Sequence, residues 1–217
     1  MVGPWSIKFN MLGKKIKKEV QALTIIDRAT SWPEIIPAQS KDSQVISELF
    51  DSEWLCRYPR PVRVIHDNGS EFIGMEFQEM LSSYGIKSSP TSVKNPKGNA
   101  IVERMHLTAG DMLRTAEFEG NNWKYELNKT LQSVAWAIRS TVSTVTNYSP
   151  GQLVFSKDMI MQVQVIAEWE RIKELRRTST VKSNTSENKS RLVHKFKFGD
   201  KVLILLKANN EIVAKMA

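Results

Sequence analysis

The sequence contains a single cysteine, Cys56, in 217 residues. One cysteine excludes an internal disulfide framework and any zinc site built from paired cysteines. No stretch approaches the roughly 20 consecutive apolar residues of a membrane-spanning helix, and lysines interrupt the first 30 residues, where a secretory signal would need an apolar core. We therefore expect an intracellular protein with no membrane partner, and an apolar content of 41% is sufficient for a folded core.

Acidic residues are scarce at the two ends of the chain, whose net charge is +8. Residues 171–201 hold ten lysines or arginines against three acids, and residues 1–19 hold five lysines against one glutamate. Clustered positive charge favours a polyanionic partner such as nucleic acid, because neutralised phosphates supply affinity that does not depend on base sequence. The alternative is a solvated basic helix and linker with no such partner.

Short apolar runs alternate with longer amphipathic stretches, and this order predicts the fold class. Three runs come first, so we expect a three-stranded meander, followed by strands that alternate with helices. Such an order is typical of an α/β fold, a mixed sheet flanked by helices. The expected strands are 5–9, 20–27, 33–38, 62–66 and 85–90, and the expected helices are 43–55, 70–85, 99–118 and 122–141.

The last quarter of the chain has a different composition. Residues 157–177 read as a helical extension. Residues 178–194 are polar and basic with few apolar side chains, which predicts a flexible linker. Residues 195–217 contain two apolar runs that could pair, and since two strands are marginal alone, we interpret them as part of a small β-domain.

Two acidic residues, Asp67 and Glu103, are the candidates for chemistry. Asp67 directly follows the strand expected at 62–66, and Glu103 lies in the first turn of the helix expected from 99. Strand ends and adjoining helix starts form the usual ligand crevice of an α/β sheet, and paired carboxylates suit Mg²⁺ in phosphodiester chemistry. Each acid also has a simpler interpretation, Asp67 as a turn former and Glu103 as a residue that complements the helix dipole.

The sequences around these acids resemble a known family. The segments "LTIIDRATSW" (23–32), "VIHDNGSEF" (64–72) and "GIKSSPTSVKNPKGNAIVERMH" (85–106) are similar to the catalytic core of retroviral-type integrases, most of all those of gypsy-type LTR retrotransposons. The resemblance covers residues 1–156. The resemblance implies a ribonuclease H-like fold. Residues 195–217 are in turn similar to the start of the SH3-like β-barrel that follows this core in the family.

The resemblance also implies a function, which is DNA integration by strand transfer. Family members hold Mg²⁺ or Mn²⁺ with two aspartates and a glutamate, and the motif match assigns Asp67 and Glu103 to two of these positions. Their partners are element DNA ends and target DNA, they form homo-oligomers, and they act in the nucleus. Alternatives are a nucleic-acid-binding remnant without chemistry and an interaction protein that assembles through its long helices.

The first aspartate of the family does not fall within this sequence. It lies three residues before the Gly-Pro-Trp that stands here at 3–5, which is one residue before Met1. We therefore expect strand transfer by this chain to be weak or absent. Asp27 is a poor replacement, because the matching family position is not catalytic, and we expect it to brace the turn at 28–30.

Five residues near Glu103 are candidates for binding nucleic acid. Lys94 and Lys97 flank an Asn-Pro pair and suit phosphate groups, and Asn99 lies one helical turn before Glu103. Arg104 could reach a phosphate or form a surface ion pair. His106 could contact DNA or lie at the edge of the core.

Overall fold

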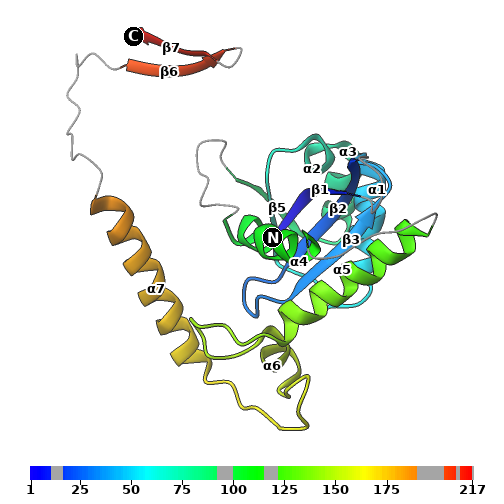
Figure 1. The fold of residues 1–217 in the computed structure, drawn as a ribbon, viewed down its shortest axis with the longest axis vertical. Coiled ribbons are helices and arrows are strands. Elements are labelled where there is room, and N and C mark those ends of the chain that lie inside the picture. The colour runs from blue at the N-terminus through cyan, green and yellow to red at the C-terminus, as the bar shows by residue number, and fades with distance from the viewer. Residues whose placement is uncertain (11–16, 92–99, 115–121, 190–202, 209–210, 217) are drawn as a thin grey trace. The chain divides into compact units, whose positions relative to one another are not determined.

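The computed structural model describes the chain in two compact units, Met1–Ile172 and Lys173–Ala217. Figure 1 shows the helices and strands of both units. The described residues are 1–10, 17–91, 100–114, 122–189, 203–208 and 211–216.

The first unit begins with the meander that the sequence predicts. Strand β1 (Val2–Asn10) pairs antiparallel with β2 (Lys17–Ile26), and β2 pairs antiparallel with β3 (Pro33–Ala38). Side chains alternate between the two faces of a strand, so the apolar residues of β2 supply a core on each side. Residues 11–16, between β1 and β2, lie outside the described residues.

A second, parallel pair of strands follows. Strand β4 (Arg63–His66) pairs with β5 (Lys87–Pro90), and β4 also lies against β1. Parallel neighbours need a crossover connection, which helices α2 (Ser70–Ile73) and α3 (Met75–Ser83) provide. The mixed α/β architecture is therefore confirmed.

The single helix predicted over 70–85 is wrong in one respect, because it is broken at Gly74. The Cα of Gly74 packs against Ser43, where a Cβ would lie 2.3 Å from the Ser43 Oγ. That hydroxyl in turn accepts a hydrogen bond from the Phe77 backbone N–H at 3.2 Å, near the start of α3. The break is a tertiary effect, whereas the predicted end of the helix at Gly85, with φ of 68°, is confirmed.

Helices cover both faces of the meander (Figure 1). On one face lie α1 (Ser43–Phe50), its π-helical continuation η1 (Asp51–Leu55) and α3, which share a core with Leu23 and Ile36. The other face is covered by α4 (Ala100–Arg114) and α5 (Trp123–Ser140). The short helix α6 (Pro150–Phe155) packs against α5 and begins with a capping box between Ser149 and Gln152.

Helix α4 buries one stripe of side chains against the sheet. The stripe comprises Val102, Met105, Ala109 and Leu113, which recur at helical spacing. Met112, on the same helix, is only half-buried.

Two boundaries predicted in the last quarter of the chain are wrong. Residues 159–168 are not helical, because the Asp158 carboxylate accepts hydrogen bonds from the Ile160 and Met161 N–H groups and turns the chain. Helix α7 (Trp169–Lys189) then runs through most of the predicted linker. It contains no glycine or proline, and Thr180 and Thr185 bond to carbonyls four residues back. A hairpin of β6 (Leu203–Ala208) and β7 (Glu211–Met216) follows, while the complete β-barrel stays a prediction.

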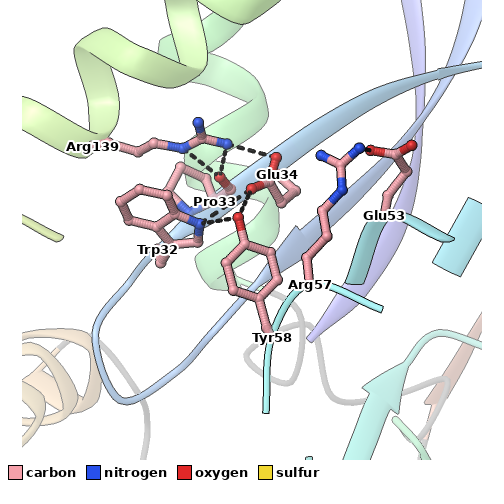
Figure 2. A network of polar contacts seen from close by, with 7 residues as sticks. All are labelled: Trp32, Pro33, Glu34, Glu53, Arg57, Tyr58 and Arg139. Atoms are coloured by element: carbon pink, nitrogen blue, oxygen red, sulfur yellow. Dashed lines mark hydrogen bonds and ion pairs between the residues drawn. The ribbon is translucent and has the colours of Figure 1, made fainter. Parts of the chain in front are cut away.

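A buried network of hydrogen bonds and one ion pair connects α5 to β3 (Figure 2). The Arg139 guanidinium lies 2.6 Å from the Glu34 carboxylate and donates two hydrogen bonds to the Pro33 carbonyl. Glu34 also accepts from the Trp32 indole at 3.2 Å and from the Tyr58 hydroxyl. Burial, followed by the contact with Glu34, raises the pKa of Tyr58. Residues from three separate segments are thus held around one carboxylate.

Replacement of Arg139 by methionine should destabilise the chain strongly. It leaves Glu34, whose side chain is only 12% exposed, without its cation, and we expect a loss of about 2–3 kcal/mol in the free energy of unfolding. Urea denaturation measures this loss. The matched control is Lys129→Met on the exposed side of the same helix, which should change stability by less than about 0.5 kcal/mol. Equal effects of the two substitutions would contradict the assigned role.

Candidate metal and nucleic-acid site

Asp67 lies directly after β4, at the point where the chain turns into α2. Its Oδ1 accepts a hydrogen bond from the Gly69 N–H at 3.1 Å, and the Gly69 carbonyl accepts from Phe72 in the first turn of α2. Its other carboxylate oxygen makes no hydrogen bond or ion pair with any residue that the structure describes. Asp67 is therefore a turn former through one oxygen and leaves the second oxygen available to a ligand.

His66, the residue before Asp67, is 1% exposed. Its Nδ1 lies 2.6 Å from the carbonyl oxygen of Asp67, and its Nε2 lies 2.9 Å from the hydroxyl of Ser88 on β5. Sequence reasoning did not select this histidine. The available signal was the strand alternation, which places His66 on the same buried face as Val64.

Glu71 is a second residue that sequence reasoning missed. It is 5% exposed, and its carboxylate lies against the Cα of Gly69, where an added Cβ would come within 2.6 Å of it. The absence of a side chain at Gly69 thus lets a carboxylate lie inside the turn that Asp67 begins.

Glu103 lies in the first turn of α4 and is exposed. Its neighbours Val102 and Met105 are buried, so the rotation of α4 directs Glu103 away from the core. It forms no ion pair with a described residue. Like Asp67, it is an acid without a cationic partner among the residues that the structure describes.

His106 has a definite structural role. Its ring stacks on Trp5 with centroids 5.1 Å apart, and its Nε2 lies 2.8 Å from the Thr24 hydroxyl. Because that hydroxyl donates to the Gly3 carbonyl at 2.7 Å, it accepts from His106, so Nε2 carries the proton. Burial lowers the pKa of His106 to about 4.

The other predicted nucleic-acid contacts are placed only in part. Lys94, Lys97 and Asn99 lie outside the described residues, and Arg104 is exposed on α4. Their binding to nucleic acid stays a prediction, as does that of His106, whose Nε2 is engaged by Thr24.

Asp27 braces a turn, as predicted. Its carboxylate accepts hydrogen bonds from the backbone N–H groups of Ala29 and Thr30 and from the Thr30 hydroxyl. Both oxygens are thereby used inside the loop between β2 and β3.

Comparison with known proteins identifies the first part of the chain. Residues 3–96, which include Asp67, match the integrase core domain family. This region is similar to the core domain of integrases.

Two curated relatives belong to retroviral-like elements. The chain is 25% identical over 146 residues to the Gag-Pol polyprotein of walleye dermal sarcoma virus, which covers 66% of the chain and 8% of the relative. It is 23% identical over 137 residues to the Pol polyprotein of the Drosophila melanogaster transposon 412, covering 63% of the chain and 11% of the relative. The chain thus spans about a tenth of the length of these polyproteins.

Solved structures agree on the fold. An intasome structure from simian T-cell lymphotropic virus, in complex with a PP2A regulatory subunit, aligns with a TM-score of 0.55 at 18% identity and covers 76% of this chain and 57% of that one. The HTLV-2 integrase core in complex with magnesium, in a trimeric form, aligns with a TM-score of 0.48 at 20% identity and covers 70% and 93% of the two chains. The first of these alignments confirms the predicted fold class, a mixed α/β sheet flanked by helices as in an integrase.

Among the residues that the structure describes, no three His, Cys, Asp or Glu side chains gather into a metal-binding group. The carboxylates of Asp67 and Glu103 are hard oxygen donors of the kind that Mg²⁺ prefers, so the residue types fit a divalent cation, but a complete ligand set needs a further donor. Across the same described residues, no helix is both long enough and apolar enough to cross a membrane.

The His106 contact predicts a pH dependence of stability. The unfolded chain protonates His106 near its ordinary pKa of 6.5 and the folded chain only near 4, so the unfolded state binds more protons between these values. The contribution of neutral His106 to the free energy of unfolding is therefore fully present above pH 6.5, and it is lost as the pH drops towards 4. Because solvent screens the partly exposed ring, we expect the loss in the free energy of unfolding to be about 1–2 kcal/mol.

Urea denaturation at pH 7, 6, 5 and 4, compared with His106→Gln, measures this effect. Glutamine keeps an N–H donor for Thr24 and does not titrate. Both proteins contain the same carboxylates, so the effect of carboxylate protonation cancels in the difference between their stabilities. Parallel stability curves for the two proteins would contradict the assignment.

Proposed function

We propose that this chain acts as the catalytic core of a retrotransposon integrase and joins element DNA ends to target DNA by polynucleotidyl transfer. The observation that carries the proposal is the state of Asp67. One of its oxygens is fixed in the turn after β4 and the other has no described protein partner, within the segment that matches the integrase core domain. A carboxylate held at one oxygen and free at the other suits a metal ligand.

Asp67 and Glu103 would hold the divalent cation, Mg²⁺ or Mn²⁺. When bound, the cation supplies charge stabilisation for the attacking and leaving oxygens of an in-line displacement. The contribution of the chain is to place the two carboxylates, Asp67 through the turn and Glu103 through the rotation of α4. Neither carboxylate is neutralised by a described cationic side chain.

A third acidic ligand is required for full activity. Asp27 uses both oxygens in its own loop, so it does not substitute for the family's first aspartate. We propose that the family's first aspartate, which the motif match does not find in residues 1–217, completes the ligand set.

Element ends and target DNA would be bound through basic side chains and through self-association. Arg104 is exposed beside Glu103, and the basic residues of α7 add positive charge in the second unit. Tyr125 and Trp136 on α5 are 71% and 47% exposed, and large exposed aromatic side chains favour a subunit contact. A nuclear location follows from action on chromosomal DNA.

A strand-transfer assay with Mg²⁺ or Mn²⁺ tests the proposal. We expect joining by a chain extended upstream by the aspartate and a completed first strand, and little or none by residues 1–217. In the extended chain, Asp67→Asn and Glu103→Gln should each lower the rate by at least about 100-fold, since each removes a charged ligand. The control is Glu79→Gln on the exposed side of α3. Activity that survives Asp67→Asn would overturn the assignment.

A nucleic-acid-binding remnant without chemistry is the second candidate, favoured by the basic residues at both ends of the chain. Fluorescence anisotropy with duplex DNA separates the two. A remnant would bind equally with and without Mg²⁺, whereas the proposed core should bind more tightly with Mg²⁺. Between 50 and 200 mM salt, either protein should lose affinity steeply through counterion release, so a small salt effect would exclude both.

A further inference from the structure

His66 connects β5 to the backbone of Asp67. The carbonyl of Asp67 can only accept, so the nitrogen 2.6 Å away, Nδ1, carries the proton of the imidazole. Nε2 is then an acceptor, and the Ser88 hydroxyl 2.9 Å away donates to it. The neutral ring is fully hydrogen-bonded and spans from Ser88 to the residue that we assign to the metal.

The surroundings of the ring are apolar. The Phe72 and Phe77 rings lie 5.4 and 6.2 Å from it, centroid to centroid, and the side chain is almost completely buried. A phenylalanine would fill this space without the cost of desolvating two nitrogens. Packing alone therefore does not account for a histidine here, whereas its two hydrogen bonds do.

These bonds fix the orientation of Asp67. Thr91 donates its N–H to the His66 carbonyl at 2.7 Å, which anchors the peptide before Asp67. The His66 ring holds the carbonyl after it, and the Gly69 N–H holds Oδ1. With the main chain fixed on both sides and one carboxylate oxygen engaged, the direction of the remaining oxygen is determined.

We propose that His66, supported by Ser88, is a positioning residue that orients the Asp67 carboxylate towards a divalent cation. The inference rests on the proposed function, because it takes Asp67 as the ligand. His66 acts through the Asp67 main chain and does not itself contact the metal. Partners of this kind around a ligand commonly change metal affinity by about 10–100-fold.

The test measures binding of Mn²⁺ alone, from the electron paramagnetic resonance signal of the free ion, for the chain extended by the aspartate. His66→Phe fills the cavity and removes both hydrogen bonds, and it should raise the Kd by at least about 10-fold. His66→Asn returns an N–H donor near the position of Nδ1 and should restore affinity to within about threefold of the unmodified chain. Ser88→Ala should weaken binding by an intermediate factor, with Ser89→Ala as the matched control on the same strand.

The outcomes distinguish a failure of the positioning role of His66 from a failure of the proposed metal ligand, Asp67. If Asp67→Asn weakens Mn²⁺ binding and His66→Phe does not, the positioning role is overturned and the proposed metal ligand stands. If Asp67→Asn leaves Mn²⁺ binding unchanged, both are overturned. Thermal unfolding without metal checks that each variant is folded. If the His66→Phe variant does not fold, the serine variants provide the test, and equal Kd values for Ser88→Ala and Ser89→Ala would overturn the positioning role.

Discussion

The Thr24 hydroxyl makes the contact on which the candidate site most depends. It donates to the Gly3 carbonyl on β1 and accepts from His106 on α4, and it is completely buried on β2. Three elements thus meet at one oxygen. Glu103 is three residues from His106, less than one helical turn, so the rotation that brings His106 to Thr24 also sets the direction of Glu103. A slip of α4 by one residue would break this contact and turn Glu103 about 100° around the helix axis.

The two helices on this face of the sheet, α4 and α5, are held by different kinds of polar contact. Helix α4 is held by a neutral histidine and its stacking on Trp5, whereas α5 is held by the ion pair between Arg139 and Glu34. An arginine stays charged at any pH a folded protein meets, so acid acts on the α4 contact through His106. The attachment of the element that carries Glu103 therefore depends on proton concentration.

The sequence predicted what depends on local pattern and missed what depends on distant neighbours. The meander, the strand before Asp67 and the buried stripe of α4 follow from periodicities of two and 3.6 residues. The break at Gly74 could not be read in this way, because its cause is Ser43, which is 31 positions away. Helix α7 was missed because polar composition suggested a linker, although the segment contains no residue that would end a helix. His66 and Glu71 were missed because each is a polar side chain buried by tertiary contacts.

The unpaired acids favour the proposed catalytic core over a simple binding surface. Asp67 and Glu103 have no described cationic partner, and Arg104 is exposed next to Glu103. Uncompensated carboxylates repel a phosphate backbone, so a protein that only bound nucleic acid would lose affinity by keeping them there. A divalent cation between carboxylate and phosphate reverses the sign of that interaction. The hydrogen bond from His66 to the Asp67 carbonyl, with Ser88 bonded to the other ring nitrogen, supports the same proposal, because it fixes the main chain that carries the proposed ligand.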